Sequence, residues 1–222
     1  MVTKLKCTFV FFLLLTTSLI SHAQSKLFNG KNLKGWYAYE PKTGKHTNAS
    51  DIFYVENKMI RLYGDKLGYV MTEKSFSNFQ LTVVFRWNTD STITRKSNKR
   101  NSGIMYLVPT STKDTLWPKG IQYQVKEGGT GDFVLLQEVT LMVKGKQTEP
   151  GKSVTSARFS DAEKPVGEWN TAVITVMNGN VKQELNGKLV NEGTLTATGE
   201  GRILLQYEGY PIDFSKIVIK KI

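Results

Sequence analysis

Sulfur ligands and imidazoles are nearly absent from this chain of 222 residues. Its single cysteine is Cys7 and its two histidines are His22 and His46. One cysteine cannot form a disulfide within the chain, and a zinc site built from several His or Cys ligands is excluded. A Ser-His-Asp triad would have to use His46, whose neighbours are typical of a polar loop. Chemistry is therefore left to carboxylates, basic residues and tyrosines.

Negative charge is also scarce. The chain has 30 Lys and Arg against 19 Asp and Glu, a formal charge of +11. The one dense basic patch runs from Arg95 to Arg100. Nucleic-acid binding would need such a patch interleaved with stacking aromatics. We therefore predict a solvated basic loop and no nucleic-acid partner.

Residues 1–23 have the pattern of a secretory signal peptide. Lys4 and Lys6 precede an apolar run from residue 9 to residue 20, and Ser21 and Ala23 supply small residues before a cleavage point. The run is short for a membrane span. We expect cleavage near Ala23 and a secreted or periplasmic protein, with an uncleaved anchor as the alternative. Cys7 precedes the apolar run, which is not the place of a lipoprotein cysteine.

Long helical patterns are missing from residues 24–222, and short β-patterned runs separated by turn residues replace them. The run Phe79–Trp87 alternates apolar and polar residues, which predicts a strand with one buried face. Asn178-Gly179 and Asn186-Gly187 favour tight hairpins. The pattern weakens over 128–167, which we interpret as a long excursion over a sheet. About a dozen strands predict a single all-β domain, a two-sheet antiparallel jelly-roll sandwich.

The stretch Gly120–Glu127 carries the first functional signal. Its polar side presents Gln122 and Gln124, two neutral amides that suit hydroxyl-rich ligands because each offers donors and an acceptor. Trp117 precedes it on a rigid turn made by Pro118. An ordinary half-exposed strand is the alternative interpretation.

Other predicted strands carry long polar side chains on the same kind of face: Arg86, Gln206 and Glu208. If these faces belong to one sheet, they line a floor of amides, one cation and one carboxylate. Aromatic walls would come from Trp36, Trp117 and Tyr210, although core packing is the alternative for Trp36. This chemistry fits a carbohydrate ligand.

Six motifs in order make the chain resemble the 3-keto-disaccharide hydrolase domain family. They lie at residues 27–36, 101–104, 120–125, 167–170, 185–187, and 201–209 together with 214–217. The resemblance implies a concanavalin A-like jelly roll, exported by bacteria, that acts on glycosides oxidised at C3 of the sugar. Two positions depart from the family pattern: Gln122 stands where a glutamate is usual, and Ser215 stands where an arginine is usual. Because glutamine cannot act as a general base, Glu208 and Glu127 are the remaining candidates.

The leading hypothesis is therefore a hydrolase that cleaves 3-keto glycosides by base-initiated elimination followed by hydration. It gives the base to Glu208 and enolate stabilisation to Arg86. Substrate contacts would come from Asn101, Trp117, Gln122, Gln124 and Gln206. No redox cofactor is required, since a separate sugar 3-dehydrogenase would make the ketone. A divalent metal is compatible with the composition, but no ligand spacing identifies one.

Two other functions stay open. One is a non-catalytic, lectin-like carbohydrate-binding module. The other is an ordinary glycosidase that uses two carboxylates, for which Glu208 and Glu127 are the plausible pair.

Overall fold

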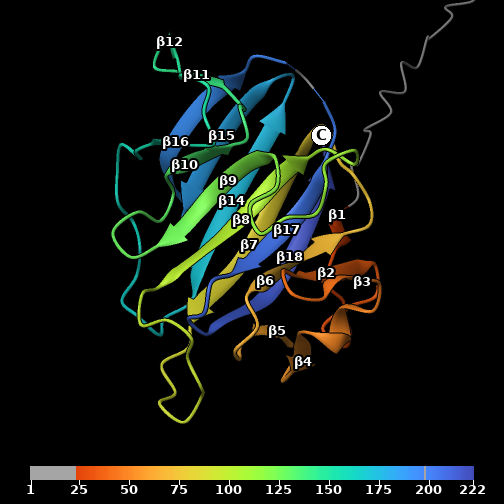
Figure 1. Cartoon of the computed structure of the whole chain (residues 1–222). Coiled ribbons are helices and arrows are strands. Elements are labelled where there is room, and N and C mark those ends of the chain that lie inside the picture. The colour runs from red at the N-terminus through yellow and green to blue at the C-terminus, as the bar shows by residue number, and fades with distance from the viewer. Residues whose placement is uncertain (1–23, 198) are drawn as a thin grey trace, which may run out of the picture.

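Two antiparallel sheets packed face to face form the domain, as Figure 1 shows for a computed structural model that describes residues 24–197 and 199–222. The expected signal peptide lies outside the described residues. Between Gln24 and Ile222, residue 198 apart, the regular structure is strands and one short 3-10 helix, η1 (Ala49–Asp51). No helix in that part of the chain is long and apolar enough to cross a membrane. The all-β prediction is confirmed.

Sheet A has ten strands. In spatial order they are β12 (Lys146–Gln147), β11 (Leu141–Val143), β16 (Lys188–Leu195), β15 (Asn180–Leu185), β14 (Asn170–Met177), β7 (Phe79–Trp87), β18 (Ile212–Lys221), β5 (Met59–Leu62) and β4 (Tyr54–Glu56), with β1 (Gln24–Lys26) paired to β18.

Sheet B has eight strands and carries the polar faces that concern function. In spatial order they are β13 (Ser153–Ser156), β10 (Phe133–Leu136), β9 (Gly120–Lys126), β8 (Asn101–Val108), β17 (Arg202–Tyr207), β6 (Gly68–Thr72), β2 (Trp36–Glu40) and β3 (Gly44–His46).

The core lies between the two sheets, because each long strand turns its apolar side inward. In β7, Phe79, Leu81, Val83 and Phe85 are fully buried. Opposite them, β9 contributes Ile121, Tyr123 and Val125 to the same cluster. The alternation therefore leaves Gln122 and Gln124 on the outer face of sheet B, as predicted.

Two of the three aromatic side chains expected as groove walls are core residues instead. Trp36 is 2 % exposed and donates its indole N–H to the backbone oxygen of Leu27 over 2.7 Å. Tyr210 is 6 % exposed and packs edge-on against Trp87. Only Trp117 of the three is an exposed side chain.

The weakly patterned region 128–167 does not lie over a sheet as expected. It extends both sheets: β10 and β13 join sheet B, whereas β11 and β12 join sheet A. The basic residues 95–100 lie in the β7–β8 loop, which projects beyond the sandwich in Figure 1. Backbone bonds from Lys96 and Ser97 to the oxygen of Gly209 return this loop to the domain.

The outer face of sheet B is divided into two parts. The irregular segment 109–119, here called the β8–β9 loop, covers one part, where side chains of the strands form a second apolar cluster beneath it, separate from the core. Beneath the loop its members include Tyr37, Tyr69, Met71, Met105 and Leu204, and Val134 and Leu136 of β10 continue the cluster into the other part. The other part, towards β9, β10 and β13, carries Gln122, Val134 and Leu136, which are 4 %, 7 % and 3 % exposed.

Candidate functional site

A groove of about 420 Å³ occupies this second part of the outer face of sheet B, over β9 and β10. Strands β8, β9 and β10 form its floor, the β8–β9 loop forms one wall, and the start of β13 forms the other. Its lining residues are Asn101, Trp117, Gln122, Gln124, Val134, Leu136, Gln137, Lys152, Ser153 and Glu208.

Three amide side chains on the floor form a chain of hydrogen bonds that ends on a carboxylate. Gln122 donates to the side-chain oxygen of Gln124, and Gln124 donates to the oxygen of Asn101 over 3.3 Å. Asn101 in turn donates to Oε2 of Glu208. Each amide thus directs its N–H towards the carboxylate, which keeps the negative charge of Glu208 solvated by fixed dipoles.

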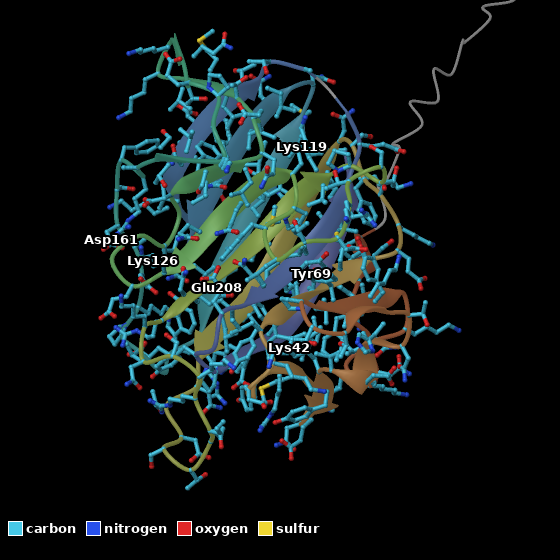
Figure 2. All side chains as sticks on the ribbon, viewed as in Figure 1. Lys42, Tyr69, Lys119, Lys126, Asp161 and Glu208 are labelled. Carbon is cyan, nitrogen blue, oxygen red and sulfur yellow. The ribbon has the colours of Figure 1, made fainter. Side chains whose placement is uncertain are left out.

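Trp117 supplies the second donor to this carboxylate. Its indole N–H bonds to Oε1 of Glu208 over 3.1 Å, while the ring is 49 % exposed. One oxygen of Glu208 is therefore held from the floor and the other from the loop. The carboxylate, half-buried directly after β17 and labelled in Figure 2, is fixed in orientation at the edge of the groove.

Gly103 makes room for Gln122. A Cβ atom at Gly103 would lie 2.3 Å from Cδ and 2.7 Å from Oε1 of Gln122, far inside contact distance. The glutamine therefore lies flat across β8 with only 4 % of its surface exposed. Its Oε1 atom has no hydrogen-bond partner among the described residues. An acceptor buried on the floor of a groove is suited to a hydroxyl of a ligand.

Five of the seven predicted site residues line this one groove: Asn101, Trp117, Gln122, Gln124 and Glu208. Gln206 does not. It points from the outer face of β17 but is fully buried under the β8–β9 loop, where it donates to the oxygen of Leu116 over 3.3 Å.

Arg86 lies in the other sheet, so it cannot neighbour Glu208. Strand β7 pairs with β14 and β18 of sheet A, and Nε of Arg86 is 3.0 Å from Oδ2 of the fully buried Asp213. The guanidinium also stacks on the ring of Trp169 at 4.6 Å. The condition that the polar faces belong to one sheet therefore fails for Arg86, because the sequence pattern shows which face a side chain occupies but not which sheet its strand joins.

Glu127 is likewise outside the groove. Its carboxylate pairs with Arg100 and its side chain is 61 % exposed. Glu208 is therefore the single carboxylate among the residues that line the groove. The two-carboxylate glycosidase based on Glu208 and Glu127 does not fit this geometry.

Half of the lining residues were not predicted from the sequence. Val134 and Leu136 form an apolar strip on the outer face of β10, next to the amides, and a sugar ring has C–H patches that suit such a strip. Gln137, Lys152 and Ser153 complete the wall. The run 133–136 is apolar throughout, so its pattern did not show that Val134 and Leu136 face outward. No sequence pattern pointed to Lys152, because it reaches the groove only through the segment that leads from β12 of sheet A to β13 of sheet B.

The chain has other hollows with different chemistry. One of about 270 Å³ lies near the ends of β8 and β16 and has Lys119, Glu138 and Glu200 in its lining, without amide side chains. Among the described residues, no group of three or more His, Cys, Asp or Glu side chains is arranged to hold a metal ion.

Known structures share this sandwich. A candidate glycosyl hydrolase of Parabacteroides distasonis superimposes with a TM-score of 0.61 at 21 % identity, covering 90 % of this chain and 94 % of that one. The β-glucanase of Bacillus licheniformis gives 0.55 at 14 %, covering 89 % and 97 %. The carbohydrate-binding module CBM66 of Bacillus subtilis gives 0.50 at 14 %, covering 84 % and 96 %. At these identities the likeness shows the fold, which is one of glycosyl hydrolases and carbohydrate-binding modules.

A family match is more specific than the shared fold. Residues 23–220 match the 3-keto-alpha-glucoside-1,2-lyase-like domain, and the chain belongs to this family. The resemblance found in the sequence motifs is thereby confirmed. No curated protein sequence matches the chain significantly.

Proposed function

We propose that the groove binds a glycoside whose sugar carries a ketone at C3, and that Glu208 is the base that starts its cleavage. The observation that carries this proposal is the chain of three amides ending on one oriented carboxylate inside a groove. Membership of the lyase-like family supports the substrate class. A single carboxylate is sufficient for an elimination, whereas ordinary glycoside hydrolysis needs two.

The proposed reaction begins with the C2–H bond, which the C3 ketone acidifies. Glu208 takes the C2 proton, and the electron pair passes to the carbonyl oxygen as an enolate. The enolate then reforms the ketone as the C1–O bond breaks, which leaves a C1=C2 double bond and a leaving group that takes up a proton. Water adds across the double bond in the second stage, so the sum is hydrolysis without a change of oxidation state.

The remaining lining residues supply binding and charge stabilisation. Lys152 is the cation of the groove and would donate to the enolate oxygen, the role that the sequence analysis gave to Arg86. The unpartnered oxygen of Gln122 would accept a sugar hydroxyl, while Val134 and Leu136 would contact a C–H face. The groove has a volume of about 420 Å³ and is bounded on one side by the β8–β9 loop, so its size suits a short glycoside.

A binding module is the second candidate, and two observations favour it. Both oxygens of Glu208 already accept hydrogen bonds from the protein, as they would in a carboxylate that only shapes the groove. The usual glutamate of the family is also replaced by Gln122.

The test compares wild type with Glu208→Gln on a 3-keto disaccharide and on its unoxidised parent, with free sugar as the readout. We expect the ketone alone to be cleaved, and the variant to lose about 10²–10⁴ in rate while still binding the substrate. Glu127→Gln is the matched control, since it removes a carboxylate outside the groove, and it should keep full turnover. Equal rates for wild type and Glu208→Gln would exclude Glu208 as the base. Binding without turnover by wild type would favour the binding module.

A further inference from the structure

The β8–β9 loop is attached to sheet B by a buried polar cluster that none of the steps above uses. Asp114, in the middle of the loop, accepts hydrogen bonds from the hydroxyls of Tyr37 at 2.7 Å and Tyr69 at 2.5 Å. Tyr37 and Tyr69 come from β2 and β6, on the side of the sheet away from the groove. Their rings are buried in the apolar cluster beneath the loop.

Arg202, the first residue of β17, adds a second set of contacts to this cluster. Arg202, which is 7 % exposed, donates to the Tyr37 hydroxyl over 2.8 Å and to the backbone oxygen of Pro109 over 3.0 Å. The guanidinium of Arg202 thus connects Pro109, the first residue of the loop, to Tyr37, which binds Asp114 in the middle of the loop. Burial, together with the neighbouring carboxylate of Asp114, raises the pKa of Tyr37 and of Tyr69 well above the usual range. Both hydroxyls therefore remain protonated donors.

Trp117 follows Asp114 by three residues and has weaker attachments of its own. Leu116 accepts from Gln206 at 3.3 Å, and the backbone oxygen of Trp117 accepts from Gln137 at 3.4 Å. Both are long hydrogen bonds, and the indole ring itself is half-exposed. The short charge-assisted bonds that fix the loop are those at Asp114.

We propose that Asp114, held by Tyr37 and Tyr69, is a positioning residue that keeps the indole N–H of Trp117 on the carboxylate of Glu208 and keeps its ring as a wall of the groove. Asp114 does not line the groove, so it acts through the loop. The effect on turnover rests on the proposed function, whereas the placement of Trp117 does not.

The experiment labels the protein with 5-fluorotryptophan and follows the four tryptophan resonances by ¹⁹F NMR, with Trp117 assigned from Trp117→Phe. In Asp114→Ala we expect the Trp117 resonance to move and its solvent isotope shift to grow, while those of Trp36, Trp87 and Trp169 stay in place. Asp114→Asn keeps an acceptor oxygen and should restore most of the wild-type position. Asp51→Ala is the control, because it removes a carboxylate at the end of η1 whose partners are Asn48 and His46, far from the groove in the fold.

Turnover of a 3-keto disaccharide is the second readout, and it should fall by about 10–10² in Asp114→Ala, since misplacement of a site by 1 Å has effects of this size. If Asp114→Ala fails to fold, Tyr69→Phe removes one donor and leaves the ring, and it should move the same resonance. An unchanged Trp117 resonance, or equal movement of all four, overturns the proposal. If the wild type has no turnover, the proposed function fails while the resonances still decide the role of Asp114.

Discussion

Substitution of Gly103 by alanine tests the arrangement of the amide floor without touching a polar group. The added Cβ would lie 2.3 Å from Cδ and 2.6 Å from Cγ of Gln122, which are atoms of a side chain and can move. The strand backbone itself accepts alanine, because only a φ between +20° and +160° would strain it, and Gly103 is not among the glycines with positive φ. The perturbation is therefore directed at Gln122.

The expected cost follows from what Gln122 must give up. Loss of its hydrogen bond to Gln124 costs about 0.5–1.5 kcal/mol. A displaced rotamer adds about 0.5–1.5 kcal/mol. We therefore expect Gly103→Ala to lower the free energy of unfolding by about 1–3 kcal/mol. A ligand that donates to Oε1 of Gln122 loses one hydrogen bond as well, which weakens binding roughly 2- to 12-fold.

Urea unfolding and calorimetric titration with a 3-keto disaccharide measure the two effects, the titration in the Glu208→Gln background to prevent turnover. The double variant Gly103→Ala/Gln122→Ala is the control. It removes the side-chain atoms that the new Cβ would meet, so the alanine at 103 should then cost little. If Gly103→Ala destabilises the protein equally with and without Gln122, the close contact is not the cause and the reasoning about the floor is refuted.

Three further outcomes are expected. Arg86→Ala should lower the free energy of unfolding by about 1.5–3 kcal/mol in urea, because buried Asp213 loses a charged donor; a loss of turnover at unchanged stability would contradict this structural role. Burial raises the pKa of the Glu163 carboxyl above its usual value of 4.5. The protonated side chain therefore contributes fully to stability below pH 4.5, and this contribution is lost as the pH rises through the pKa of Glu163 in the folded protein. Glu163→Gln should therefore stabilise the protein at neutral pH and flatten that decline in unfolding curves, whereas parallel pH profiles of variant and wild type would contradict it. Intact-mass measurement of exported protein should give a chain beginning at or near Gln24, and a mass retaining residues 1–23 would contradict cleavage.

The period-two alternation predicted the long strands well. The expected bounds of 79–87 agree with β7, and Gln122 and Gln124 share a face as expected. About a dozen strands were expected and the described residues contain eighteen, among which β1, β3, β11, β12 and β16 had no clear pattern. Four of these are two or three residues long, and Lys188–Leu195 of β16 mixes polar and apolar residues without a clean alternation.

The site was predictable only in part, for a physical reason. A strand pattern determines which side chains share a face, but hydrogen bonding between distant segments determines which strands are neighbours. Asn101 and Gln124 meet because β8 and β9 are consecutive strands. Arg86 carries the same kind of pattern and yet belongs to the other sheet. Gln206 is on the expected sheet and face, but the β8–β9 loop covers it, and no local pattern predicts where an irregular loop packs.

The strands at the ends of both sheets bear on how the protein behaves at high concentration. Unpaired backbone groups at a sheet edge are templates for strands of other molecules. Here the edge strands are short: β12 has two residues, β3 and β4 have three each, and β13 has four. Lys146, Lys45 and Glu56 place charge on three of them. Such edges offer few hydrogen bonds to an incoming strand, and they protect a sandwich without disulfides from ordered aggregation.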